Sequence, residues 1–348
     1  MGARLWPKKS GWGKPLHPKR NILSGPTPLE RAEKLSKHLD IDLHIKRDDL
    51  AGPSFGGNKA RQLEYYFGEA LSQDADTILI TGAVQSNFTR TAVAVARSLG
   101  MRAVVQLEDR VKDGSAHYRN SGNVLLSRLM GAEIEFYPEG ENEDGADIAL
   151  DRKAALLRSA GRRPYIIHLS EAHPPLGALG YVDAATELLD QNKDFEIFVV
   201  ASGSGATHAG LLAGLRYCGS KALVIGSCVR RVAALQGPRI ERVLERLGDL
   251  YSPANNVTNR DIRVWDVALA PGYGRIGPRS LEAIRLMASL EGLFLDPVYT
   301  AKSFSAIPSL VETGDIPKGA SVCFVHTGGL AALYAYEDQL GALLGTQD

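Results

Sequence analysis

Short runs of apolar, often β-branched residues alternate along the chain with longer stretches in which apolar residues recur every three or four positions. The short runs have the length of buried strands, and the longer stretches have the period of helices that bury one face. Helices are predicted from Ser86 to about Leu99 and over Asn123–Met130. Strands are predicted at Thr77–Thr81, Ala103–Leu107, Glu133–Tyr137, Tyr165–His168, Phe195–Ala201, Leu223–Ser227 and Ser321–His326.

Strands that alternate with helices at this spacing are typical of parallel sheets covered by helices on both faces. The predicted fold class is therefore α/β, and 348 residues allow about two domains. In such folds, ligands bind in the crevice at the carboxyl ends of the strands. The residues that directly follow each strand are therefore the candidates for a functional site.

Composition and charge exclude several classes of protein. The formal net charge is +0 without a basic block, whereas nucleic-acid binders usually carry a basic face. No apolar run approaches the roughly 18–20 residues of a membrane span, and the basic stretch 1–20 lacks the apolar segment of a signal peptide. The three cysteines, Cys218, Cys228 and Cys323, form no CxxC pair and are expected in the core. A cytoplasmic globular protein is predicted, without nucleic-acid or membrane partners.

The acidic segment Pro138–Asp147 is interpreted as an exposed loop or the beginning of a helix. Its carboxylates lack the one-three-five spacing of calcium loops, so a solvated face is favoured over a metal site. No metal is expected.

The first candidate motif is Gly56-Gly57-Asn58-Lys59, which precedes a helical pattern. A lysine at a helix start is poorly placed as a structural cation, because the helix dipole prefers anions there. A desolvated lysine in an electropositive place has a lowered pKa and becomes a nucleophilic amine. By itself, this motif favours a surface lysine.

The second motif, 81–90 (TGAVQSNFTR), lies between a strand and a helix. It places Ser86 and Asn87 at the helix N-cap, where free N–H groups could bind a carboxylate. Ordinary capping explains the same residues equally well.

The third motif, 201–210 (ASGSGATHAG), follows a strand and opens a helix. Its glycines and hydroxyls can turn N–H and O–H groups toward one phosphate. No Gly-Lys-Ser/Thr follows, and the GxGxxxxG spacing is not that of a dinucleotide site, so a single phosphate monoester fits better. His208 is expected to be a core or capping residue.

Two tyrosines and a Gly pair complete the candidates. Tyr273 (in PGYG) and Tyr299 (in LDPVYTAK) are predicted in loops, where they could be structural or could move protons. The segment 326–329 (HTGG) follows a strand and is expected to open the last helix, either as a plain tight turn or as part of the site.

Taken in order, these segments resemble the fold-type II pyridoxal-phosphate (PLP) enzymes, and within them the family of D-cysteine desulfhydrase and 1-aminocyclopropane-1-carboxylate deaminase. The resemblance runs from about Asn21 to Leu340 and includes KRDD, GGNKxRxLE, GAVQSN, SGSGxTHAG, GYG, DPVY and HTGG. It implies a tryptophan synthase β-like fold of two domains, each an open, mostly parallel twisted sheet flanked by helices. The implied bounds are 1–70 and 171–348 for a large PLP-binding domain and 71–170 for a small domain.

The resemblance implies that Lys59 carries PLP as a Schiff base and moves the Cα proton. Asn87 would bind the 3′ oxygen of the cofactor, and Thr300 and Thr327 would lie near the pyridine nitrogen and the ring edge. The phosphate would be bound by Ser202, Gly203, Ser204, Gly205, Ala206 and Thr207. The catalytic residues implied are Lys59, Ser86, Tyr273 and Tyr299. The substrate-binding residues implied are Gln85, Ser86, Asn87, His173 and Tyr299.

Position 300 separates the two activities of this family. The cyclopropane deaminases have a glutamate there, facing the pyridine nitrogen, and a carboxylate keeps that nitrogen protonated and makes a deep electron sink. Thr300 supplies no charge, and expelling thiolate demands less than opening a cyclopropane. The favoured reaction is α,β-elimination of D-cysteine to pyruvate, ammonia and hydrogen sulfide, carried out by a homodimer.

Two departures from the desulfhydrase pattern leave alternatives open. Phe88 stands where those enzymes usually have histidine, and the segment 170–175 (SEAHPP) is closer to the deaminases. The alternatives are the cyclopropane deaminase reaction, which gives 2-oxobutyrate and ammonia, and a lyase for cysteate, β-chloroalanine or serine. A β-replacement enzyme, a racemase and an inactive binding protein also remain open.

Overall fold

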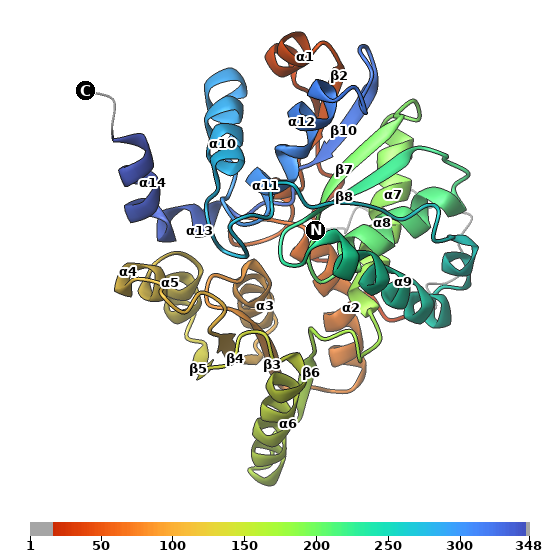
Figure 1. Ribbon diagram of the computed structural model, residues 1–348. Coiled ribbons are helices and arrows are strands. Elements are labelled where there is room, and N and C mark those ends of the chain that lie inside the picture. Colours follow the sequence, from red (N-terminus) through yellow and green to blue (C-terminus); the bar gives the residue numbers. More distant parts are fainter. Residues whose placement is uncertain (1–16, 346–348) are drawn as a thin grey trace, which may run out of the picture.

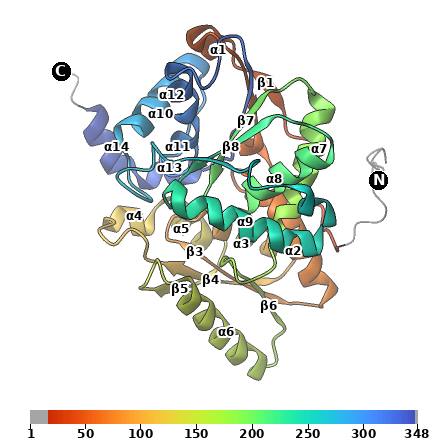
Figure 2. The same cartoon turned by 45° about the vertical axis from the view of Figure 1, so that its right-hand side comes forward.

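The computed structural model describes residues 17–345, in which two sheets lie beside each other, each covered by helices (Figures 1 and 2). Most of the basic N-terminal stretch therefore lies outside the described residues. The arrangement confirms the predicted α/β class with two mostly parallel sheets.

The larger sheet has six strands in the order β1-β2-β10-β7-β8-β9. Only the β1·β2 pair is antiparallel, and the other neighbours run parallel. The bounds are β1 Leu29–Arg31, β2 Asp42–Lys46, β7 Ile197–Ser202, β8 Leu223–Cys228, β9 Arg263–Trp265 and β10 Ser321–Val325.

The smaller sheet has four parallel strands in the order β5-β4-β3-β6. The bounds are β3 Thr77–Ala83, β4 Arg102–Glu108, β5 Glu133–Tyr137 and β6 Pro164–Ile167. All four strands come from one continuous stretch of chain, as expected for an inserted small domain. The domain bounds themselves stay a prediction.

Helices cover both faces of each sheet (Figures 1 and 2). On the larger sheet, one face carries α2 Lys59–Ser72, α7 Leu179–Gln191, α8 Ala206–Tyr217 and α9 Ala233–Leu250, and the other carries α1 Glu33–Leu39, α10 Pro278–Glu291, α11 Thr300–Phe304 and α12 Ala306–Glu312. On the smaller sheet, α6 Glu143–Ser159 lies opposite α3 Asn87–Ser98 and α5 Gly122–Leu129. The remaining helices are α4 Ala116–Asn120, α13 Leu330–Ala335 and α14 Glu337–Leu344.

Strand β3 is buried on both faces, which explains why its central residues, 78–80, are all apolar. Ile78 and Ile80 point into the core shared with α3, whereas Leu79 points into the cluster formed with α6, and all three are fully buried. Successive side chains of a strand face opposite sides, so a parallel strand covered on both faces has no polar alternation.

The predicted strands are all present, with ends that differ by a few residues, and strands β1, β2 and β9 were not predicted. The acidic segment does begin a helix, α6, but its interpretation as a solvated face is wrong for Glu143 and Asp147. Both carboxylates are largely buried, because arginines and histidines from other elements pair with them. The HTGG segment opens α13, and one further helix, α14, follows it.

Two smaller observations complete the fold. Cys228 and Cys323 are buried as expected, but Cys218 is exposed, and all three are free thiols. Within residues 17–345, no helix is long and apolar enough to cross a membrane.

Candidate active site

A cavity opens where the carboxyl ends of strands from both sheets meet. Its empty volume is about 790 Å³, part of it open to solvent, which is within the usual range for small-molecule sites. The wall is formed by Asn58, Lys59, Gly82, Ala83, Ser86, Asn87, Phe88, Arg110, Leu169, Ala201, Gly203, Ser204, Gly205, Thr207, Val229, Arg230, Tyr273, Tyr299, Thr327 and Gly328. This wall contains three cationic side chains and no aspartate or glutamate, so the cavity favours anions.

Lys59 begins helix α2 and lies on the cavity wall. Its Nζ donates a hydrogen bond to Gln62 Oε1 at 3.1 Å and lies 5.0 Å from the centre of the Phe88 ring. Desolvation lowers the pKa of this amine from 10.5 to about 8. The structure therefore places an amine with raised nucleophilicity in the cavity, and Phe88 contributes to its dry surroundings.

The loop before Lys59 is held in place by its glycines and by one buried arginine. Gly56 has a φ of +61°, and a Cβ there would lie 2.0 Å from the Asp49 carbonyl oxygen, so only glycine fits. Arg90 of α3 donates hydrogen bonds to the carbonyl oxygens of Ser54 and Gly56, and also to Asn87 Oδ1. The first and second sequence motifs are thus joined directly.

The N-terminus of α8 forms an anion cradle. Gly205, with a φ of +105°, turns the chain into the helix, and no described residue accepts a hydrogen bond from the N–H groups of 205–207. Thr207 Oγ1 accepts hydrogen bonds from Asn58 Nδ2 at 2.9 Å and Gln62 Nε2 at 2.8 Å. Both acceptor positions of this hydroxyl are therefore used, and its proton is left to donate to a ligand. Free N–H groups, a free O–H and a helix dipole fit a phosphate.

Side chains behind the cradle hold its carbonyl groups away from the cavity. Arg239 Nε donates to the Ser204 carbonyl oxygen at 2.9 Å, and Gln236 Nε2 donates to that of Gly203 at 3.1 Å. Ser202 does not line the cavity, since its hydroxyl contacts His208 Nδ1 and Gln236. His208 is fully buried with its pKa lowered to about 4 by desolvation, which confirms its interpretation as a core residue.

Helix α3 presents a second N-terminus to the cavity. Ser86 is its N-cap and accepts hydrogen bonds from the N–H groups of Phe88 and Thr89. Asn87 uses its Oδ1 on Asn123 and Arg90, so its amide N–H groups stay available. Both residues line the cavity.

Gln85 lies outside the cavity wall, although it was assigned to the substrate. Its amide donates hydrogen bonds to the carbonyl oxygens of Tyr118 and Ser121 and accepts one from the N–H of Asn123. Both of its amide protons and one lone pair of its oxygen connect the start of α3 to the α4–α5 segment, so its assignment to the substrate stays a prediction that this geometry does not favour.

Tyr273 and Tyr299 both line the cavity, and their hydroxyl oxygens lie 2.6 Å apart. Burial raises the pKa of both phenols, and for Tyr273 the nearby Arg110 guanidinium opposes the shift. The pair therefore stays protonated near neutral pH and can relay a proton.

The two threonines assigned to the cofactor ring differ in position. Thr327 lines the cavity. Thr300 is fully buried outside the wall, and its hydroxyl donates to Asp296 Oδ1 at 2.7 Å. Its placement near the pyridine nitrogen stays a prediction.

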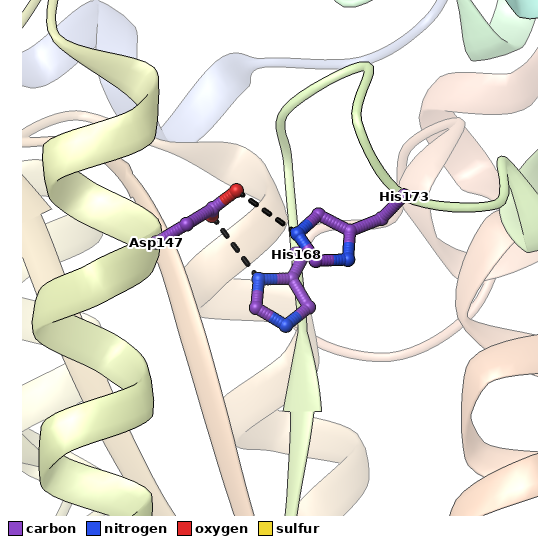
Figure 3. A group of neighbouring side chains, drawn as sticks. All are labelled: Asp147, His168 and His173. Atoms are coloured by element: carbon purple, nitrogen blue, oxygen red, sulfur yellow. Dashed lines mark hydrogen bonds and ion pairs between the residues drawn. The ribbon is translucent and has the colours of Figure 1, made fainter.

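His173 belongs to a cluster beside a smaller hollow that shares Phe88 and Leu169 with the main cavity. Figure 3 shows Asp147 of α6 facing both His168 and His173, with each O–N distance 3.1 Å. The two rings are stacked 3.5 Å apart and nearly parallel. A shared ion would lie outside the plane of at least one ring, whereas imidazole binds metals in its plane. The cluster is better suited to holding the 168–173 loop on α6.

Sequence reasoning missed two residues of the cavity wall, Arg110 and Arg230, and one residue beside it, Gln62. Gln62 lies three positions after Lys59 on the same helix face, and it contacts both Lys59 and Thr207. Arg110 and Arg230 each lie two residues beyond the end of a strand, β4 and β8. The rule that site residues follow strand ends would have found both.

The chain matches a family model described as pyridoxal-phosphate dependent enzyme over residues 21–328. It is 38% identical over 326 residues to D-cysteine desulfhydrase of Klebsiella pneumoniae (strain 342), which covers 93% of this chain and 97% of that protein. D-cysteine desulfhydrase of Salmonella paratyphi C (strain RKS4594) is also 38% identical, over 92% of this chain and 98% of that protein. Among solved structures, an ACC deaminase homologue superposes with a TM-score of 0.83 at 32% identity, covering 94% of this chain and 96% of the other.

Proposed function

The chain belongs to the family of pyridoxal-phosphate dependent enzymes, and we propose that it catalyses α,β-elimination from a small β-substituted amino acid, D-cysteine above others. The products would be pyruvate, ammonia and hydrogen sulfide. The observation that carries the proposal is the Lys59 amine, which shares one anion-favouring cavity with the α8 cradle. Two D-cysteine desulfhydrases that resemble the chain over nearly its whole length support the choice of substrate.

The residues of the cavity fit the cofactor. The free N–H groups of 205–207 and the free hydroxyl proton of Thr207 would bind the phosphate of the cofactor. Lys59 would bind the cofactor covalently. Asn87, with free amide N–H groups, would bind its phenolic oxygen. When bound, PLP supplies an electron sink for the Cα of an amino acid attached to it.

The protein would contribute binding and proton transfer. The N-terminus of α3 and the Ser86 hydroxyl would orient the substrate carboxylate. Lys59 is the one amine on the described cavity wall, and a pKa of about 8 suits it to take the Cα proton near neutral pH. The Tyr273–Tyr299 pair, still protonated, would donate a proton to the departing group.

The cavity wall contains no aspartate or glutamate, and this favours the elimination over the cyclopropane deaminase reaction. The wall described above has no carboxylate that could keep a ring nitrogen protonated, and Asp296 is buried behind Thr300. A good leaving group such as thiolate therefore suits the site better than a carbon–carbon bond. The similarity to an ACC deaminase homologue and the 170–175 segment support the deaminase as the second candidate.

A substrate panel decides between these reactions. We expect the PLP-loaded protein to release pyruvate from D-cysteine and β-chloro-D-alanine without an added nucleophile. Release of 2-oxobutyrate from 1-aminocyclopropane-1-carboxylate is expected to be at least about 100-fold slower, since a missing ring-nitrogen charge is worth several kcal/mol of barrier. Equal rates would contradict the assignment, and a requirement for an added nucleophile would indicate a β-replacement enzyme.

The lowered pKa of Lys59 gives a second expected result. Only the neutral amine attacks an aldehyde, so the rate at which apoprotein takes up PLP should rise about tenfold per pH unit at low pH. It should level off near pH 8, where the pKa of Lys59 lies, instead of near 10.5. Stopped-flow absorbance measures this profile. A rate that still rises steeply above pH 9 would show that the amine is not desolvated.

A homodimer and a cytoplasmic location complete the proposal. Symmetric dimers are the commonest assemblies of soluble enzymes.

A further inference from the structure

Helix α3 carries a fully buried arginine, Arg90, in its first turn, directly behind the cavity wall. The first turn contains no aspartate or glutamate. The helix dipole is positive at this end, so a cation is unfavourable there. Burial adds a desolvation cost, which lowers the pKa of Arg90 from 12.5 to about 10.

No acidic side chain offsets these costs. The elements packed against α3 are α2, α5, β3 and β4. Their carboxylates are Glu64, Glu69 and Glu108, and all three are bound to other side chains. Arg90 forms no ion pair within residues 17–345, and desolvation is the single cause of its lowered pKa. Buried charges in proteins are normally paired, so the charge of Arg90 needs an explanation.

Four neutral oxygen atoms surround the guanidinium group. Its Nη1 donates to the carbonyl oxygens of Ser54 and Gly56. Its Nε donates to Asn123 Oδ1 at 3.0 Å, and its Nη2 donates to Asn87 Oδ1 at 3.4 Å. A neutral amide could donate to such oxygens without the cost of a buried charge. Fixing the loop at 54–56 therefore explains the hydrogen bonds of Arg90 but not its charge.

Asn87 connects this charge to the cavity. Its Oδ1 accepts hydrogen bonds from Arg90 and from Asn123 Nδ2, the latter at 3.0 Å. An amide whose oxygen accepts a hydrogen bond from a cation is polarised, and its N–H groups become stronger donors. Asn87 lines the cavity, and under the proposed function its N–H groups bind the phenolic oxygen of the cofactor. That oxygen, when ionised, supplies the negative charge that Arg90 lacks.

We propose that Arg90 is a positioning residue that acts through Asn87: it places a positive charge behind the phenolic oxygen of the bound cofactor and keeps that oxygen ionised. This role rests on the proposed function and adds to it a residue that does not itself touch the cofactor. The cavity wall has no acid that could hold a proton on the ring nitrogen. A cation behind the phenolic oxygen would instead stabilise the negative charge that the cofactor takes up from Cα.

A cofactor analogue without an aldehyde tests this charge apart from catalysis. Deoxypyridoxine phosphate has the phenol and the phosphate of the cofactor but cannot react with Lys59. Its ultraviolet absorbance reports whether the phenol is ionised. A nearby cation lowers the pKa of a phenol. In Arg90→Gln, the pH at which the bound analogue ionises should therefore rise by about one unit.

Two further variants separate charge from geometry. Arg90→Lys keeps the charge but loses the planar guanidinium group, so the bound analogue should ionise close to the wild-type pH. Arg97→Gln removes an exposed cation about two turns later on α3 and should leave that pH unchanged. Keto-acid release from D-cysteine should fall about tenfold in Arg90→Gln, and Arg90→Lys should recover part of it.

The other titratable groups of the cavity wall are the same in all these variants. Burial raises the pKa of Tyr273 and Tyr299, so both phenols stay neutral near neutral pH. Lys59 has a pKa of about 8, and its contribution cancels when the variants are compared. Arg110 and Arg230 stay charged throughout.

The outcomes separate this inference from the proposed function. If the protein binds PLP, but Arg90→Gln ionises the bound analogue at the wild-type pH, only the role of Arg90 is overturned. An equal rise in Arg90→Lys and Arg90→Gln would show that geometry matters and charge does not, and would also overturn it. A protein that binds neither PLP nor the analogue would contradict the proposed function itself. If Arg90→Gln does not fold, Arg90→Met carries the same comparison, since it too keeps a long side chain without the charge.

Discussion

Replacing Lys59 with alanine is expected to abolish both the colour and the activity of the enzyme. Wild-type protein incubated with PLP should absorb at about 410–420 nm, and Lys59→Ala should not. Keto-acid release from D-cysteine should fall by a factor on the order of 10⁴, because the variant loses its covalent attachment point and its Cα base together. Difference spectra and a coupled pyruvate assay measure the two effects.

Two controls separate covalent attachment from simple loss of charge. Lys59→Arg keeps a cation in the cavity but has no nucleophilic amine, so it should also lack the band. Lys34→Ala, an exposed substitution on α1, should match wild type. A Lys59→Ala protein with the wild-type band would show that another amine binds the cofactor.

Replacing Asp48 with alanine is expected to lower the free energy of unfolding by about 3–5 kcal/mol, the usual effect of removing one partner of a buried ion pair. Asp48 is fully buried and accepts hydrogen bonds from Thr27, Arg61 and Tyr181. Arg61 lies two residues after Lys59 in α2 and also pairs with Glu187. The network therefore fixes the helix that carries the reactive amine.

Urea denaturation of Asp48→Ala measures this loss, with Asp42→Ala as the control. Asp42 of β2 forms a largely exposed ion pair with Arg31 of β1. Its removal should therefore lower the free energy of unfolding by about 1 kcal/mol or less. A loss below about 1 kcal/mol for Asp48→Ala would mean that the network does not stabilise the fold.

The same network predicts a response to acid. Burial alone would raise the pKa of Asp48, but the Arg61 guanidinium and the hydrogen bonds lower it below 3.8. A carboxyl with a lowered folded-state pKa stabilises the protein above its unfolded value, and this stabilisation is lost as pH falls through the folded value. The stability difference between wild type and Asp48→Ala should therefore narrow below about pH 4.

Local sequence patterns predicted seven of the ten described strands and the N-termini of α3 and α8 correctly. The apolar run of β3 and the Ser86 cap depend on neighbouring residues alone, so they can be identified without the fold. The short edge strands β1 and β9, with three residues each, carry too little pattern to predict and form because a longer strand lies beside them.

Which residues line the cavity, and which are buried elsewhere, depends on contacts between segments that are distant in the sequence. Gln85 looked like a site residue from its place in the motif, yet its amide connects α3 to α4 and α5. Glu143 and Asp147 looked solvated, yet arginine and histidine side chains distant in sequence pair with them and cover them. Such partners lie dozens of residues away, and no local pattern reports them.

The sequence by itself determined the fold class, the family, and Lys59 as the candidate reactive amine. These features rest on short-range patterns: the apolar strand runs, the glycines before Lys59 and the cradle at 201–207. Only the tertiary structure decided that the cavity wall carries no acid and that Arg110 and Arg230 line the same cavity. Charge balance in a cavity is a sum over side chains from both sheets, so it exists only after those sheets have come together.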